Sequence, residues 1–337
     1  MKPIMRITLL PFAIATILPL VAAPSPAQTL EMPAFNLESK ITLGNVKGRI
    51  DHMALDQLGG RLFVAELENN TVGVVDLTAR KVIHVITGLT EPQGVGYEPS
   101  TDTLYVANGG DGSVRFYRGA DYAETGRIDL GDDADNVRID PNAKRVFIGY
   151  GGGAIATIDP AARTKVADFA LPAHPEGFQL DRKNNQIVVN VPRARAIVTL
   201  DGVSGQQKAA WPMKDAGGNF PMALDEDAQR VLVAFRNPAK LGAFSARDGE
   251  SIASVDLCGD ADDLFVDAKR GRVYVSCGEG FVDVFNARDR DYGRLARVPT
   301  VRGARTSYYV PSVDRLFLAV RAASLEPAAV WVYRPVP

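Results

Sequence analysis

Short apolar segments recur along the chain at nearly constant spacing. Each is preceded by another apolar stretch and a turn rich in Asp, Asn, Lys and Gly, as at residues 53–60. Each is followed by a third apolar segment, as at residues 72–76, and then by a more polar fourth segment, as at residues 81–86. The seven central segments begin 41 to 44 residues apart, at residues 62–65, 104–107, 146–149, 187–190, 231–234, 273–276 and 316–319.

This pattern predicts a repeated all-β unit of four antiparallel strands. The apolar positions are continuous or alternate by two, and none holds the 3.6-residue period of a helix, which excludes helical solenoids of similar repeat length. A four-stranded unit of this size cannot bury both faces alone and must stack on its neighbours. The sequence therefore predicts a seven-bladed β-propeller.

The two ends of the chain predict how the ring closes. The last unit has only three strands, within residues 307–333, whereas residues 38–44 precede the first unit and are similar to the outer strands elsewhere. A closed ring has no open sheet edges, which would otherwise favour aggregation. We expect the N-terminal strand to complete the last blade, which makes residues 36–337 a single propeller.

The first residues have the features of a secretory signal. Lys2 and Arg6 precede an apolar run at residues 7–23, and Ser25 and Ala27 supply a small-residue cleavage site. The alternative is a membrane anchor, but Pro11 and Pro19 interrupt a run that is already short for a span. We expect residues 1–27 to be cleaved, residues 28–35 to form an extension, and the mature protein to be periplasmic or secreted with no stable membrane span.

Charge and cysteine content narrow the classes further. Without Lys2 and Arg6, 36 basic residues face 40 acidic ones, a formal charge near −4, so no nucleic-acid partner is expected. Only Cys258 and Cys277 are present. Because an exported protein meets an oxidising compartment, the two are a disulfide candidate between neighbouring blades, with two inert thiols as the alternative.

One unit resembles a known repeat. Residues 91–99, the tetrapeptide Tyr105-Val106-Ala107-Asn108 and residues 112–114 resemble the YVTN-type β-propeller repeat, whose signature survives only partially in the other units. The resemblance implies an exported seven-bladed propeller. It says little about activity, because that family includes binding proteins and surface-layer components, and related propellers are enzymes.

The topology of a propeller gathers certain loops on one face. Loops that lead into the inner strands and loops between second and third strands share that face, and function is usually carried by such loops. Ten polar residues there are candidate ligand-binding residues: His52, Glu66, Asn108, Asp135, His174, Glu176, Arg236, Asp263, Arg305 and Arg321.

Two chemical hypotheses apply to this face. A divalent metal ion fits an oxygen-rich set with histidine, and the candidates are His52, Glu66, His174, Glu176 and Asp263, although no dense metal motif is present and hydrogen-bonded loop residues are the alternative. Arginines could instead bind an anion, since guanidinium suits carboxylate and phosphate, with simple solvation as the alternative. No haem or nucleotide is indicated, because CxxCH and a glycine loop before a helix are both missing from the sequence.

Three functions remain open. The first is an exported binding scaffold that recognises a small polar or anionic ligand, or a partner protein, through its loop-rich face. The second is a metal-assisted hydrolase, lyase or lactonase in the axial pocket, by analogy of fold only. The third is a subunit of a larger periplasmic complex. Whether the protein is catalytic is left open by the sequence.

Overall fold

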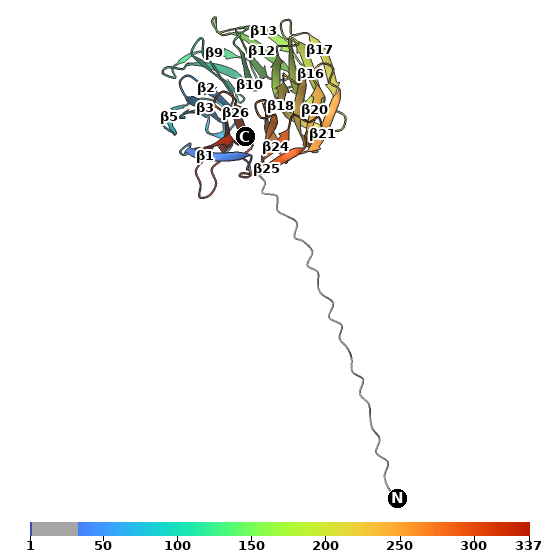
Figure 1. Cartoon of the computed structure of the whole chain (residues 1–337). Helices are drawn as coiled ribbons and strands as arrows, with labels where there is room; N and C mark the ends of the chain where they lie inside the picture. The colour runs from blue at the N-terminus through green and yellow to red at the C-terminus, as the bar shows by residue number, and fades with distance from the viewer. Residues whose placement is uncertain (2–32) are drawn as a thin grey trace. The chain divides into compact units, whose positions relative to one another are not determined.

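Seven four-stranded antiparallel sheets make up residues 33–337 of the computed structural model, and Figure 1 shows them arranged in a ring. The structure describes these residues and Met1. The predicted signal peptide, and the predicted extension up to residue 32, lie outside the described residues. The seven-bladed architecture predicted from the repeat is confirmed.

Each blade runs outward from an inner strand near the axis to an outer strand at the rim. Blades one to six take their strands in chain order, and blade seven has the order β26-β27-β28-β1. The inner strands are β2 (Met53–Asp56), β6 (Pro92–Glu98), β10 (Ala134–Asp140), β14 (Phe178–Asp181), β18 (Gly217–Asp225), β22 (Ala261–Asp267) and β26 (Ser307–Val310). The second strands are β3 (Arg61–Glu66), β7 (Thr103–Asn108), β11 (Arg145–Tyr150), β15 (Gln186–Val191), β19 (Arg230–Asn237), β23 (Arg272–Cys277) and β27 (Arg315–Val320).

The remaining strands complete the blades. The third strands are β4 (Thr71–Asp76), β8 (Ser113–Arg118), β12 (Ala154–Asp159), β16 (Ala196–Asp201), β20 (Ala239–Ser245), β24 (Phe281–Asn286) and β28 (Ala329–Pro335). The outer strands are β5 (Lys81–Ile86), β9 (Glu124–Asp129), β13 (Thr164–Ala170), β17 (Gln207–Pro212), β21 (Ser251–Asp256), β25 (Arg294–Pro299) and β1 (Phe35–Thr42). Two single 3-10 turns, η1 (Leu67–Asn69) and η2 (Pro192–Ala194), follow second strands. Within the described part of the chain, no helix is long and apolar enough to cross a membrane.

The core lies between adjacent blades. Second and third strands are almost wholly buried, whereas outer strands alternate with exposed polar residues, as the sequence pattern predicts. One cluster joins Tyr105 and Phe116 of blade two to Val146 and Ile148 of blade three. Because each blade covers the apolar face of the next, the blades depend on one another for burial.

An acidic residue at the end of the inner strand fixes the first hairpin in six of the seven blades. In each, the carboxylate accepts a hydrogen bond of 2.7–3.2 Å from the backbone N–H three residues further on, an arrangement that stabilises tight turns. These residues are Asp56, Glu98, Asp140, Asp181, Asp225 and Asp267.

Strand β1 closes the ring by pairing antiparallel with β28, which confirms the predicted closure. The pairing runs from Phe35 opposite Pro335 to Thr42 opposite Ala329, so the strand begins one residue before the predicted boundary of the propeller. Glu38 forms ion pairs with Arg315 of β27 and Arg334 of β28. Burial acts to raise the pKa of Glu38, but these two arginines lower it below its usual value.

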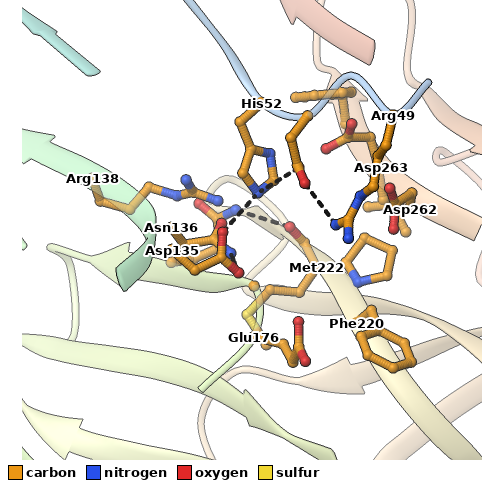
Figure 2. A pocket seen from close by; sticks show the side chains of 16 residues that line it. Arg49, His52, Asp135, Asn136, Arg138, Glu176, Phe220, Met222, Asp262 and Asp263 are labelled. Carbon is orange, nitrogen blue, oxygen red and sulfur yellow. Dashed lines mark hydrogen bonds and ion pairs between the residues drawn. The ribbon is translucent and has the colours of Figure 1, made fainter. Parts of the chain in front are cut away.

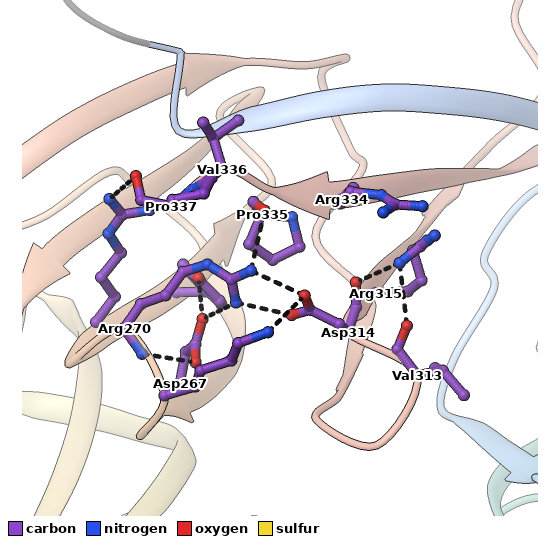
Figure 3. A network of polar contacts seen from close by, with 12 residues as sticks. Asp267, Arg270, Val313, Asp314, Arg315, Arg334, Pro335, Val336 and Pro337 are labelled. Carbon is purple, nitrogen blue, oxygen red and sulfur yellow. Dashed lines mark hydrogen bonds and ion pairs between the residues drawn. The ribbon is translucent and has the colours of Figure 1, made fainter.

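A polar network holds the C-terminal residues to blade six (Figure 3). Arg270 donates to Asp267 at 2.9 Å and to both carboxylate oxygens of Asp314 at 2.7 and 2.8 Å, and it also donates to the carbonyl of Pro335 at 3.1 Å. The guanidinium of Arg270 holds the pKa of Asp314 well below its usual range. Blades six and seven are thereby joined by charge as well as by apolar packing.

Truncating Ile41 tests the closure. This side chain is 2% exposed and packs in the cluster that contains Val330 and Val332, so Ile41→Ala should lower the free energy of unfolding by about 3 kcal/mol. The measurement is urea denaturation of the full chain. Leu58→Ala is the control, because Leu58 is 93% exposed and its loss should change stability by less than about 0.5 kcal/mol. Equal effects of the two substitutions would contradict a closing role for β1.

Candidate functional site

A polar cavity lies on the propeller axis, where the inner strands converge (Figure 2). We call it the axial cavity. Its mouth is lined by Asp133, Gly151, His174, Arg236 and Arg305, and its lower end is lined by Arg138, Gln179, Asp263 and Phe265. Arg49, Asp135, Glu176, Phe220 and Asp262 line both parts and so connect them.

Local sequence explains why these side chains point inward. The residues just before the apolar part of each inner strand are polar, as at Asp51 and His52 before β2, Asp135 and Asn136 in β10, and Glu176 before β14. Seven blades repeat the same geometry around one axis, so the positions at equivalent places in different blades face one another. Residues distant in sequence therefore form one site.

Three arginines of the cavity are paired with carboxylates. Arg49 contacts Asp51 at 2.6 Å. Arg305 contacts Asp260 at 2.7 Å and Asp262 at 3.0 Å, and Arg236 pairs with Asp262 as well. Each of these three cations is thus balanced by at least one carboxylate.

Asp135 and Glu176 have no such cationic partner. Asp135 is 7% exposed, and its Oδ1 accepts no hydrogen bond within residues 33–337, with Nε2 of His52 at 3.6 Å as its nearest basic neighbour. Burial raises the pKa of Asp135 to about 7, partly offset by His52 and reinforced by the charge of Asp51. Burial also raises the pKa of Glu176 to about 7, and the charge of Asp262 adds to that effect.

His174 joins this acidic pair to form a group of three potential metal ligands. Asp135, His174 and Glu176 each offer one atom, and all three atoms lie within 4.8 Å of one another. Nδ1 of His174 lies 2.7 Å from the carbonyl oxygen of Gly151, which can only accept a hydrogen bond. Nδ1 is therefore the donor in this contact, and in the neutral imidazole Nε2 then carries the lone pair.

Asp263 of blade six and Arg138 of blade three both line the lower end of the cavity. Asp263 accepts a hydrogen bond of 2.7 Å from the backbone N–H of Ser307, which joins blade six to blade seven. Burial, with the charge of Asp262, raises the pKa of Asp263 well above its usual value. Arg138 donates to the carbonyl of Phe178 at 3.0 Å and is itself so buried that its pKa is lowered.

The structure brings most of the predicted ligand residues together, but not all. Those that line the axial cavity are His52, Asp135, His174, Glu176, Arg236, Asp263 and Arg305.

Three predicted residues do not belong to this set. Glu66 is buried beside its own hairpin, where it accepts a hydrogen bond of 2.5 Å from Thr71. Asn108 donates to the backbone and hydroxyl of Ser113 at 3.2 Å, so it fixes its own loop. Arg321 is partly exposed and is not among the residues that line the cavity. In the first two cases a local hydrogen bond holds the side chain away from the axis.

Sequence reasoning missed Arg138 and Gln179. Both lie inside inner strands, where alternation turns every second side chain toward the channel, and Gln179 donates to the carbonyl of Met222 at 2.8 Å. The signal was present as a polar residue between two apolar ones, in Val137-Arg138-Ile139 and Phe178-Gln179-Leu180. Both residues lie in strands and therefore outside the loops to which the candidate residues were assigned.

Cys258 and Cys277 form a disulfide in the structure. Cys258 follows the outer strand β21 of blade five, and Cys277 ends β23 of blade six. The bond therefore links two neighbouring blades, the pairing that the sequence offered as a candidate.

The fold and the site define a seven-bladed β-propeller with a polar axial cavity, and the chain is similar to solved structures of this fold. One is described as Kuenenia stuttgartiensis hydrazine synthase, with a TM-score of 0.73 and 18% identity over 83% of this chain and 93% of that chain. Another is described as the mitotic checkpoint complex, with a TM-score of 0.74 and 14% identity over 95% of this chain and 98% of that chain. No protein-family model and no curated protein sequence matches the chain. These identities show the fold alone, and the YVTN resemblance stays a prediction.

Replacing Asp263 tests the electrostatics of the cavity. Its pKa is higher in the folded chain than the value of about 4 expected in the unfolded chain, so the folded state keeps a proton that the unfolded state has released. The free energy of unfolding of the parent should therefore fall, relative to Asp263→Asn, as the pH rises above about 4. Asn keeps an oxygen acceptor for Ser307 but cannot ionise. Denaturant unfolding at several pH values measures the difference, and parallel pH profiles would contradict the assignment.

Proposed function

We propose that this protein is an exported binding scaffold whose axial cavity holds a small polar ligand. The observation that carries the proposal is the buried Oδ1 of Asp135, which lines the cavity without a hydrogen-bond partner in the described chain, as does Oδ1 of Asn136. An unsatisfied buried acceptor costs roughly 1–3 kcal/mol, and a ligand that donates to it offsets that cost. Both atoms are acceptors, so the ligand carries hydrogen-bond donors.

The same contacts argue against an anion as the ligand. Arg236 and Arg305, two of the arginines that could bind an anion, are ion-paired with Asp260 and Asp262. An anion would have to break those pairs and approach Asp135 and Glu176. A neutral polyol or an amine meets no such opposition, and it gains from the unpaired carboxylates.

Export is part of the proposal. It is supported by the N-terminal charge and apolar pattern, and by the disulfide between Cys258 and Cys277, since such bonds persist in oxidising compartments. The expression of the full chain in a Gram-negative host tests it. We expect protein from the periplasm or medium whose N-terminus lies near Gln28 and whose intact mass lacks two hydrogens relative to the reduced form. Retention of residues 1–27, or two free thiols in exported protein, would contradict it.

Thermal unfolding with three chemical classes of probe tests the ligand proposal. Glucose represents polyols, putrescine represents amines and citrate represents anions, each added in large excess to chelator-treated protein. We expect glucose or putrescine to raise the melting temperature by about 2 °C or more, through binding to the folded state only, and citrate to give no increase.

Variants locate any binding that is found. Glu176→Gln removes an unpaired carboxylate of the cavity and should reduce the shift given by putrescine. Asp256→Asn is the control, because Asp256 lies on the outer strand β21 with a side chain that is 85% exposed. A shift with citrate alone, no shift with any probe, or equal loss in both variants would contradict the proposal.

A further inference from the structure

Three potential metal-ligating residues lie close together at the mouth of the cavity. Asp135 comes from blade three, and His174 and Glu176 come from the loop that leads into blade four. The set contains one nitrogen donor and two carboxylates, and their ligand atoms lie within 4.8 Å of one another. From this cluster we infer that Asp135, His174 and Glu176 bind one divalent first-row transition-metal ion.

The distances are close to those that one ion requires. Nitrogen and oxygen ligands lie about 2.1 Å from such an ion, so two ligand atoms on one ion are at most about 4.2 Å apart. All three ligand atoms lie within 4.8 Å of one another, so a pair at that upper bound must approach by about 0.6 Å when an ion binds.

The environment of each donor favours metal binding. Nδ1 of His174 donates to the carbonyl of Gly151 at 2.7 Å, which orients the ring and leaves Nε2 available, as is usual for histidines that bind metals. The carboxylate of Glu176 forms no hydrogen bond or ion pair to a side chain of residues 33–337 and faces the cavity, as Figure 2 shows. His174 and Glu176 are therefore oriented toward the cavity, and each has an atom that is free to bind a metal ion.

Buried polar atoms without hydrogen-bond partners are a second observation in favour of a metal ion. Oδ1 of Asp135 and Oδ1 of Asn136 are buried without partners, and both residues are less than a tenth exposed and line the cavity. A buried carboxylate without a cation is unfavourable, and a bound divalent ion removes that penalty. Arg49 and Arg305 contact other carboxylates, and Arg138 donates to the carbonyls of Phe178 and Val137.

The donor types select among metals. Calcium takes six to eight oxygen ligands, whereas this set has only three donors and one is imidazole nitrogen. Imidazole with carboxylates suits zinc, manganese, iron, cobalt or nickel. Three protein ligands leave coordination positions open toward the cavity, where a polar ligand of the kind proposed above would bind. The metal site and the proposed polar ligand share this cavity, and the inference rests on the proposed function only in that respect.

Zinc titration of the untagged full chain tests the inference. After chelator treatment and dialysis, isothermal titration with Zn²⁺ should give one site per chain, and Zn²⁺ should raise the melting temperature. Ca²⁺ at the same concentration should bind more weakly. His174→Ala and Glu176→Gln should each weaken zinc binding by at least 10-fold, since loss of a group that merely orients a ligand already costs about 10- to 100-fold.

A matched variant and a check of folding keep the test decisive. Asp132→Asn is the control, because Asp132 lines the same mouth but is not among the three ligands, and it should bind zinc like the parent. Circular dichroism of each variant verifies that it folds, and Glu176→Gln alone decides the test if His174→Ala prevents folding. Tighter binding of Ca²⁺ than of Zn²⁺, no zinc binding by folded parent, or full binding in both ligand variants would overturn the inference.

The outcome is separable from that of the proposed function. The probe experiment with glucose, putrescine and citrate uses chelator-treated protein, so it succeeds or fails without metal. A protein that binds putrescine but not zinc keeps the binding function and loses the metal site. A protein that binds zinc but none of the three probes keeps the metal site and loses the polar-ligand proposal.

Discussion

Closure of the ring by β1 is the constraint on which the site depends. A blade buries its second and third strands only against its neighbours, so seven blades leave two uncovered faces unless the last meets the first. The eight residues of β1 achieve this by pairing with β28, at the greatest sequence separation available. Only in the closed ring do the beginnings of all inner strands face a common axis. The cavity is therefore a property of the whole ring and not of any one blade.

That geometry brings charged side chains together at the axis, and only some of them form ion pairs. Arg49, Arg236 and Arg305 are matched by Asp51, Asp260 and Asp262, so one side of the cavity is an ion-pair network. On the other side, the buried Asp135 and the partly buried Glu176 form no ion pair with an arginine or lysine of residues 33–337, and the pKa of each is raised to about 7. Stability alone would favour neutral or paired side chains at these positions. Unbalanced buried acids are typical of functional sites, where such costs are tolerated.

The repeat made the fold predictable, because every blade restates the same alternation of apolar and polar positions. Strand order, blade number and the closing strand all follow from it, and so does the face on which the loops gather. The direction of individual side chains does not follow. Glu66 and Asn108 end the second strands β3 and β7, where hydrogen bonds with Thr71 and Ser113 hold their side chains locally. Arg138 points into the channel from inside a strand, and whether Arg236 is free or paired depends on Asp262 in the next blade.

The two similar solved structures indicate which part of the molecule determines function. Proteins described as hydrazine synthase and as part of a mitotic checkpoint complex share this fold with the chain at 18% and 14% identity, so the fold itself carries no single activity. What distinguishes one propeller from another is the set of residues that each blade presents at the axis and on the loops. In this chain those residues include acceptors with no partner, at Asp135 and Asn136, beside a histidine whose free nitrogen is fixed by Gly151. Buried acceptors without hydrogen-bond partners do not stabilise the folded protein. The chemistry of the axial cavity is therefore not explained by the fold alone.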